Sequence, residues 1–488
     1  MPHPAHPLRG ALRAATILAL GALLAGCAAV APPSAVPGAA QRHAPPDSAS
    51  PAARDAGLGV GVPSRHWWRD LKDPRLDALV EQAMARNHEL QATLATVKEA
   101  RAMAGLAERE ALPQGSLSAQ AQAMRPSLAE TDPYGQNLPR PPSRRLGTLT
   151  QSLSWEIDLF GRVGTAAAIA ERQLDAARAD AHAASALLQA EVVRQYVQLR
   201  RTQQESLQAD EEIALLRQRA ALMEQRVQAG FADRREALAA TADTARAEAE
   251  RARLQAVRHG SIAALAVLTG RSPTATDPDA EALAAPAALP DAPAAPQVTR
   301  PGELLANRPD VARADALLRA SLGDTVLAER AHLPRLSLDA VLGLNAPFGQ
   351  LGRAGALRYA AGPALQWDWL DAGRRQAREA AARAGSERAW HTFEQTVLKA
   401  LEDSEGALRH WSAAQVALEQ SQAARASASA AQAYASARAA AGMEAPTQAL
   451  EQRVGHVRAL RSELAAQADS LQAYVQVQLA LAAWQPDL

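Results

Sequence analysis

The segments SWEIDLFGR (residues 154–162) and QWDWLDAGR (residues 366–374) decide the fold, because they are one landmark that occurs twice in the chain. Each alternates apolar with polar residues and closes on Gly-Arg, and the two copies lie 212 residues apart. Gly230 and Gly442, which interrupt two long helical tracts, are separated by the same 212 residues. Landmarks that recur in order at one offset indicate an internal duplication, and therefore a fold built from two similar halves.

Long tracts rich in Ala, Arg, Glu and Gln follow each landmark, at about residues 165–229 and 374–441. Each tract ends at its glycine and resumes as a return helix, which ends near Leu268 or near Ala483. A helix of roughly 65 residues is about 100 Å long. Such a length predicts a coiled coil, a membrane span or a helical repeat. The frequent charges exclude a membrane span, so we expect packed, partly solvated helices.

Alternation of apolar and polar residues predicts strands at about residues 115–124, 146–159, 335–345 and 358–369. Taken alone, this pattern fits a soluble sheet with one buried face at least as well as the tilted strands of a membrane barrel. Four strands are too few to close a barrel within one chain, and open sheet edges cannot face lipid. In an exported lipoprotein the sheet can therefore close only by being shared with copies of the same chain, whose number the pattern does not give.

Trp155, Trp367 and Trp369 lie where the predicted strands pass into helices. Tryptophan there belongs either to an aromatic belt at a membrane interface or to a junction between sheet and helix. The position favours the junction.

The N-terminus predicts export and lipidation. Residues 1–26 combine a basic start, a short apolar segment and small residues, as secretion signals do. The Leu-Ala-Gly-Cys quartet that ends at Cys27 resembles a bacterial lipobox, in which this cysteine is lipidated; a cleaved signal with a chance cysteine is the alternative. Ala28 favours sorting to the outer membrane, by resemblance to bacterial lipoproteins. Residues 27–63, rich in Pro, Ala, Gly and Ser, are predicted to form a flexible tether.

The composition excludes several classes of protein. The 488 residues are 48% hydrophobic but only 3% aromatic, so small side chains must supply the close packing. Lys plus Arg and Asp plus Glu both number 52, which gives no electrostatic reason to expect nucleic acid. Cys27 is the only cysteine, so no disulfide forms within one chain. No metal-binding spacing, nucleotide-binding loop or hydrolase motif points to a metal, a cofactor or an enzyme.

Two further segments, DPRLDALVEQAMARNHEL (residues 73–90) and GELLANRPDVARADALLRA (residues 302–320), complete the set of landmarks. With them the chain, from Trp67 to about Leu481, resembles the TolC/OprM-type outer-membrane efflux proteins, in the lipoprotein branch that serves RND pumps. The resemblance implies a mainly α fold with membrane β structure. Its form would be a homotrimer whose twelve-stranded β-barrel, four strands per chain, continues into a long α-helical periplasmic barrel.

The same resemblance implies a domain order and a set of partners. A first repeat would span residues 64–270, a Pro-rich linker residues 271–301, and a second repeat residues 302–488. The partners would be two further copies of the chain, a periplasmic adaptor (membrane fusion) protein, an inner-membrane RND transporter and outer-membrane lipid.

The resemblance also points to site residues where the long helices turn back. Gly230 and Gly442 would mark the periplasmic end. Arg226 and Arg438, each four residues before its glycine, would help to dock the adaptor, with surface ion pairing as the alternative.

Carboxylates shortly after the second glycine form constricting rings in the family. The outer ring position falls on Glu451, nine residues after Gly442. The position three residues earlier, often Asp in relatives, is Gln448 here, which weakens the case for a double acidic ring. Glu236 is the first-half counterpart of Gln448. Glu451 could instead be an ordinary side chain on a solvated helix face. For Glu236 this is the favoured interpretation.

The predicted function is passive conduction of small molecules, such as drugs or toxic compounds, through the outer membrane of a Gram-negative bacterium. One alternative is a duct for secreted protein under an ABC exporter, and the lipobox favours the RND branch over it. The other is a periplasmic coiled-coil scaffold without a pore, which explains the long helices but not the duplicated strand pairs. An enzyme is the least favoured class, since the sequence shows no site chemistry.

Overall fold

The structure is a computed structural model that describes residues 35–43, 50–61, 64, 66–136, 139, 142–274, 278–291, 293 and 295–481. The predicted signal, the lipobox and Cys27 lie outside the described residues. The chain forms two compact units, of which the first comprises Lys98–Ala176 and Ala316–His391 and the second Ala35–Val97, Ala177–Asp315 and the residues from Thr392 onward. In the described part of the chain, no helix is both long and apolar enough to span a membrane.

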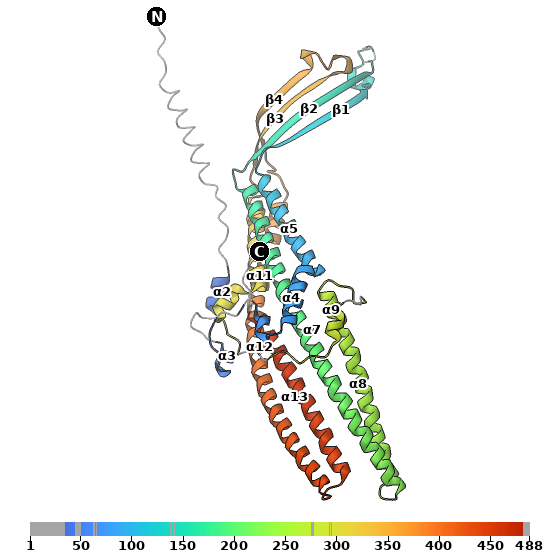
Figure 1. Cartoon of the computed structure of the whole chain (residues 1–488). Coiled ribbons are helices and arrows are strands. Elements are labelled where there is room, and N and C mark those ends of the chain that lie inside the picture. The colour runs from blue at the N-terminus through green and yellow to red at the C-terminus, as the bar shows by residue number, and fades with distance from the viewer. Residues whose placement is uncertain are drawn as a thin grey trace. The chain divides into compact units, whose positions relative to one another are not determined.

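The first unit carries a sheet of four antiparallel strands in the order β1-β2-β3-β4 (Figure 1). The strands are β1 (Gln114–Met124), β2 (Arg144–Ile157), β3 (Arg335–Pro347) and β4 (Leu357–Gln366). The fold class predicted from the alternating residues, helices with one small antiparallel sheet, is therefore confirmed. β1 and β4 are the edges of this sheet, each paired on one side only.

The register places the apolar members of all four strands on one face of the sheet. Leu149 lies opposite Leu344, and Leu342 lies opposite Tyr359. The opposite face carries mainly hydroxyl, amide and charged side chains, as where Thr148 lies opposite Asn345 and Ser154 opposite Asp339. The apolar face stays open to solvent, with Leu117 72% and Tyr359 82% exposed. The sheet thus has an open apolar face and an open polar face.

β4 ends at Gln366, three residues before the predicted end at 369. The strand prediction for Trp367 and Trp369 was therefore wrong. The β3–β4 ladder ends at the pair Arg335–Gln366, because the residue before Arg335 is Pro334, which has no backbone N–H to donate. The preference for a strand–helix junction agrees with this position.

The helices of the two halves match in length and order. Three pairs share one length each: α7 (Arg162–Gln228) with α12 (Arg374–Ala440) at 67 residues, α8 (Arg234–Leu268) with α13 (Pro446–Ala480) at 35, and α5 (His88–Arg109) with α11 (Pro309–Arg330) at 22. At 1.5 Å per residue, α7 and α12 are each about 100 Å long. The long α7–α8 and α12–α13 hairpins are visible in Figure 1.

The second unit has the larger core, built around η1 (Trp67–Leu71) and α4 (Pro74–Arg86). Asp73 caps α4 as the sequence predicts, accepting bonds from the backbone N–H groups of Arg75 (2.9 Å) and Leu76 (3.3 Å). Its second carboxylate oxygen accepts the Tyr196 hydroxyl at 2.5 Å. Burial, together with this bond, raises the pKa of Tyr196 to about 12. One aspartate therefore both starts α4 and holds it against α7.

Two short helices, α2 (Val36–His43) and α3 (Pro51–Asp55), occupy part of the segment predicted as a flexible tether. The prediction of a flexible tether was therefore wrong for Val36–His43 and Pro51–Asp55. Ala52 and Ala53 are buried in the core, and the Ala52 N–H donates to Glu405 at 3.0 Å. Tertiary contacts that no local pattern reveals stabilise these helices.

The Pro-rich linker is also partly helical. It contains α9 (Pro278–Ala284) and leads into α10 (Pro301–Asn307). Leu283 in α9 and Leu304 in α10 are buried in the core of the second unit.

Candidate functional site at the tips of the helical hairpins

Each long hairpin turns at a glycine in the left-handed backbone region. Gly230 has φ +81° and Gly442 has φ +70°. The N–H of the residue after each glycine bonds back to the carbonyl five residues earlier, Phe231 to Arg226 (2.8 Å) and Met443 to Arg438 (2.9 Å). This is a Schellman turn, which needs a residue without a Cβ at the positive φ. The sequence prediction of a tip at each glycine agrees with this geometry.

Arg226 and Arg438 reach across their own turns. Arg226 donates to the carbonyl of Phe231 at 3.4 Å, and Arg438 donates to that of Met443 at 3.5 Å. Arg438 also donates to Glu444 at 3.2 Å. Both guanidinium groups thus cap carbonyls at the end of a helix, where positive charge is favoured.

Beside each arginine the tip exposes one large apolar side chain, Phe231 (77%) and Met443 (64%). The two are related by the 212-residue offset. Sequence reasoning missed this pair, although its position directly after each glycine could have identified it.

Of the three predicted gate residues, Glu451 has a charged neighbour. Its carboxylate lies 3.7 Å from the guanidinium of Arg219 on α7, and its side chain is 61% exposed. Arg219 also lies 3.4 Å from Asp243 on α8. Sequence reasoning missed Arg219, which is 232 positions from Glu451 and carries no motif.

Gln448 and Glu236 are exposed near the starts of α13 and α8. Among the described residues Glu236 forms no ion pair. Of the two predicted gate carboxylates, Glu451 is therefore the one that the structure brings next to a charged group of another helix, where Arg219 offsets part of its charge.

A second ion-pair cluster joins α7 to α13. The Glu212 side chain, 6% exposed, accepts from Arg458 at 2.8 Å and from Arg461 at 3.0 Å. The hydrophobic contact of Leu215 and Leu216 with Val454 and Val457 lies next to it. This cluster, which the sequence did not reveal, fixes the first-half hairpin to the second.

A buried histidine lies in the N-terminal half of α7. His182 is 8% exposed. Burial, together with the neighbouring charge of Arg178, lowers the pKa of His182 from its ordinary 6.5 to about 4. The imidazole is therefore neutral at pH 7.

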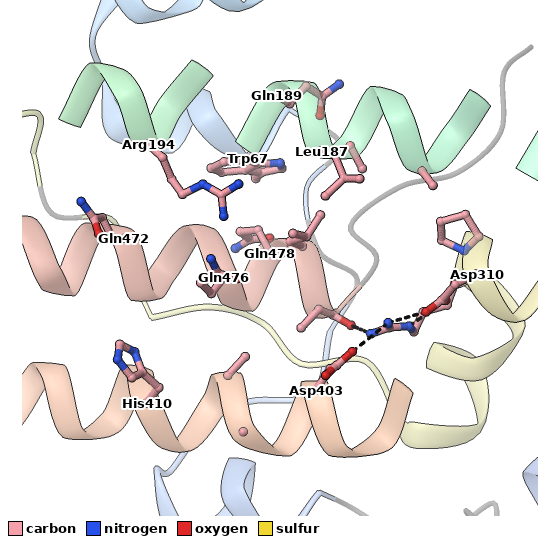
Figure 2. Close-up of a pocket in the computed structure, with 18 of the residues that line it drawn as sticks. Trp67, Leu187, Gln189, Arg194, Asp310, Asp403, His410, Gln472, Gln476 and Gln478 are labelled. Carbon is pink, nitrogen blue, oxygen red and sulfur yellow. Dashed lines mark hydrogen bonds and ion pairs between the residues drawn. The ribbon is translucent and has the colours of Figure 1, made fainter. Parts of the chain in front are cut away.

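A cavity of about 830 Å³ lies where α13 ends, between α7 and α12 (Figure 2). Trp67 and Leu187 supply apolar wall, and Gln472, Gln476 and Gln478 supply polar wall. None of the lining residues that the structure describes forms a nucleophile–base pair, so the cavity offers no catalytic arrangement.

Arg308 closes one side of this cavity. Its guanidinium donates to the Ala480 carbonyl at 2.9 Å and to Asp310 at 2.6 Å, and lies 3.5 Å from Asp403. In the first half, Asn87 makes the same kind of bond, from its side-chain amide to the Leu268 carbonyl at 3.0 Å. Each contact joins the last residue of a return helix to the residue that precedes a 22-residue helix.

The junctions of sheet and helix also match. The indole N–H of Trp155 donates to the Ala111 carbonyl, and that of Trp367 donates to the His332 carbonyl, both at 2.9 Å. The donors are 212 residues apart and the acceptors 221. Each half therefore anchors its strand to the preceding helix end by the same bond.

The described residues include no group of three or more His, Cys, Asp and Glu that could hold a metal ion. The site consists of glycine turns, exposed apolar side chains and interhelical ion pairs. An open sheet with one apolar and one polar face, joined to long charged helices, defines a channel-forming protein of the outer membrane.

The comparisons with known proteins identify the family. The model of the outer membrane efflux protein family matches residues 79–271 and 301–483, and the chain belongs to this family, whose members are channels. It is 33% identical over 386 residues to the fusaric acid resistance protein FusA of Burkholderia cepacia, covering 76% of this chain and 69% of the relative. It is 30% identical over 364 residues to the outer membrane protein OprJ of Pseudomonas aeruginosa, covering 72% of each.

Comparison with solved structures supports the same family. The outer-membrane channel OprN superimposes with a TM-score of 0.79 at 28% identity, covering 90% of this chain and 97% of that one. The chain is thus an outer-membrane efflux protein that extends into the periplasm.

Proposed function

We propose that the chain is the exit duct of a tripartite efflux pump and passively conducts small toxic molecules out of the periplasm. The single observation that carries this proposal is the two-faced sheet with unpaired edges. A soluble sheet would cover its apolar face, whereas this one leaves Leu117 and Tyr359 open. Lipid against the apolar face and a water-filled lumen against the polar face would account for the exposure of both faces.

The edges of the sheet support assembly from several copies. β1 and β4 cannot remain unpaired in lipid, so β4 of one copy must pair with β1 of the next. Three copies would give twelve strands, the number that the family resemblance implies. The matching halves support an origin by duplication, which would make the trimer approximately sixfold in its helices.

The partners follow from the tips. Phe231 and Met443, with Arg226 and Arg438 beside them, offer an apolar contact rimmed by positive charge at each hairpin turn. A periplasmic adaptor protein docking there would connect the duct to an inner-membrane RND transporter. The relatives support small-molecule cargo, since one is named for fusaric acid resistance and another for pyoverdine export.

Glu451 is the proposed gate carboxylate. Three copies would place three carboxylates around the tunnel, each held back toward the wall by Arg219. Cys27 is the proposed lipid attachment site, and residues 1–26 are the proposed signal, whose cleavage would make Cys27 the mature N-terminus. A duct of this kind needs no enzymatic activity.

Two measurements test the proposal. Purified full-length protein should open steps of ion conductance in planar bilayers and should migrate as a trimer before heating in detergent. A deletion strain should become sensitive to a panel of toxic small molecules, and the intact gene should restore resistance. A monomeric, non-conducting protein would overturn the proposal, and secretion of a protein substrate instead of resistance would favour the ABC-type duct.

A further inference from the structure

We propose that the outer end of the sheet binds the phosphate groups of lipopolysaccharide through Arg145, which lines a recess there together with Arg125 and Arg144. This inference rests on the proposed function, because it needs the sheet to lie in the outer membrane with its β1–β2 and β3–β4 connections outward. The recess has a volume of about 690 Å³. Its walls also include Met124 and Phe348.

The charged residues at the outer end of the sheet are mostly positive. The two connections and the strand ends beside them, residues 125–145 and 346–358, contain six arginines but only two acidic residues, Glu130 and Asp132. Glu130 is bonded to the backbone N–H of Ser127 at 2.8 Å, in the capping box of α6 (Leu128–Thr131). No ion pair joins Arg144 or Arg145 to any residue that the structure describes. At the other end of the sheet, by contrast, Arg162 holds Glu156 in a bidentate pair at 2.6 and 2.8 Å.

The register places Arg145 on the membrane-facing side. Arg145 lies opposite Ala123, in line with Gly147, Leu149 and Trp155 on the apolar face. Arg144 lies opposite Met124, on the polar face. Arg145 can therefore reach a lipid headgroup, whereas Arg144 lies at the rim of the lumen.

The number of residues between Trp155 and Arg145 on β2 sets how far apart the two side chains lie across the membrane. Ten residues separate Trp155 from Arg145, about 33 Å along a strand. With a strand tilt of about 40°, this is roughly 25 Å across the membrane, the height of the apolar band of an outer-membrane barrel. Trp155 then lies at the inner interface, and Arg145 lies at the level of the outer headgroups.

The chemistry at that level matches the recess. The outer leaflet of this membrane is built of lipid A, whose sugars carry phosphates. The planar guanidinium group binds phosphate in a bidentate manner, and it tolerates partial burial better than an ammonium group. Phe348, which also lines the recess, offers apolar contact to the acyl chains and sugar faces beside the phosphates.

The experiment uses the full-length lipidated trimer, freed of bound lipopolysaccharide and titrated with bisphosphorylated lipid A in native mass spectrometry. Arg145→Gln should weaken lipid A binding about ten-fold, as expected for the loss of one charge-assisted bidentate contact. Arg145→Lys should recover part of it. The matched control is Arg335→Gln, an arginine of the same sheet on its polar face at the opposite end, which should bind as the wild type does.

Lipid A without phosphates should bind the wild type weakly. Its affinity should not exceed that of bisphosphorylated lipid A for Arg145→Gln. Equal binding of the two lipid A forms, or equal loss in Arg335→Gln, would overturn the inference. Conductance of the wild type in planar bilayers keeps this result separate from the proposed function, because a wild-type channel that conducts but does not bind bisphosphorylated lipid A refutes the inference alone.

Discussion

At the scale of single residues, Glu451 and Arg219 illustrate how a gate can be tuned. The carboxylate is mostly exposed, but an arginine 3.7 Å away offsets part of its charge. An acidic ring attracts cations in proportion to its uncompensated charge. The selectivity of the tunnel should therefore depend on the arginine as much as on the acid.

We predict that Glu451→Gln lowers the cation-over-anion permeability ratio by about two-fold, and that Arg219→Gln raises it. Reversal potentials measured across a salt gradient in planar bilayers give this ratio. Glu236→Gln is the matched control, an exposed acid near the other tip without an ion-pair partner among the described residues. An equal effect of Glu236→Gln and Glu451→Gln would show that Glu451 has no special place in the tunnel.

His182 predicts a pH dependence of stability. The unfolded histidine takes up a proton near pH 6.5, but the folded one only near pH 4. The unfolded state therefore binds more protons between these values, and stability falls as pH falls from about 6.5 to 4. The loss reaches up to roughly 3 kcal/mol.

Denaturant unfolding followed by circular dichroism at several pH values measures this loss. His182→Asn should flatten the profile between pH 6.5 and 4, while His410→Asn, at an exposed histidine, should leave it unchanged. An unaltered slope in His182→Asn would show that other groups cause the dependence.

At the scale of elements, the hairpin turns depend on two glycines. Gly442→Ala puts a Cβ at φ +70°, which costs about 1–2 kcal/mol although no neighbouring atom lies within 4 Å. Gly260→Ala is the matched control, because Gly260 lies inside α8 with open space around it. That change should stabilise by roughly 0.5–1 kcal/mol. Unfolding midpoints of the two variants should move in opposite directions, and a shared direction would contradict the turn geometry.

The contact between α7 and α13 makes a second prediction at this scale. Glu212→Gln removes the only carboxylate between Arg458 and Arg461 in the described structure and should destabilise by roughly 3 kcal/mol. Glu248→Gln, which breaks an exposed pair with Arg217, should cost less than about 1 kcal/mol. Guanidinium unfolding of the full chain measures both, and equal costs would mean that Glu212 is not buried in the assembled protein.

The sequence predicted the elements that repeat local patterns, and missed those that depend on distant contacts. Period-two alternation predicted which residues of each strand share a side, and the register then placed Leu149 and Leu342 on one face of the sheet. The α2 and α3 helices were missed, because Ala- and Pro-rich segments become helical only when they pack on the core. The Arg219–Glu451 pair was missed for a similar reason, since no spacing relates residues 232 positions apart.

At the scale of the whole molecule, the two faces of the sheet must meet different solvents. Leu342→Arg places a charge on the apolar face, and near the middle of a membrane this costs about 2–4 kcal/mol. Ser152→Arg places the same charge at a similar depth on the polar face, where water is available. We predict that Leu342→Arg lowers the yield of trimer in outer-membrane fractions and that Ser152→Arg does not. Equal yields would remove the argument for lipid on the apolar face.

The equal lengths of the paired helices restrict how such a chain can change over time. Removing one turn from α12 alone would shorten it by about 5.4 Å and leave α7 as it was, so that the rim presented to a partner would become uneven. Length changes should therefore accumulate in the connections between strands, and the helices should diverge by substitution while keeping their residue count. A pump component that needs longer helices must therefore lengthen them twice, once in each half.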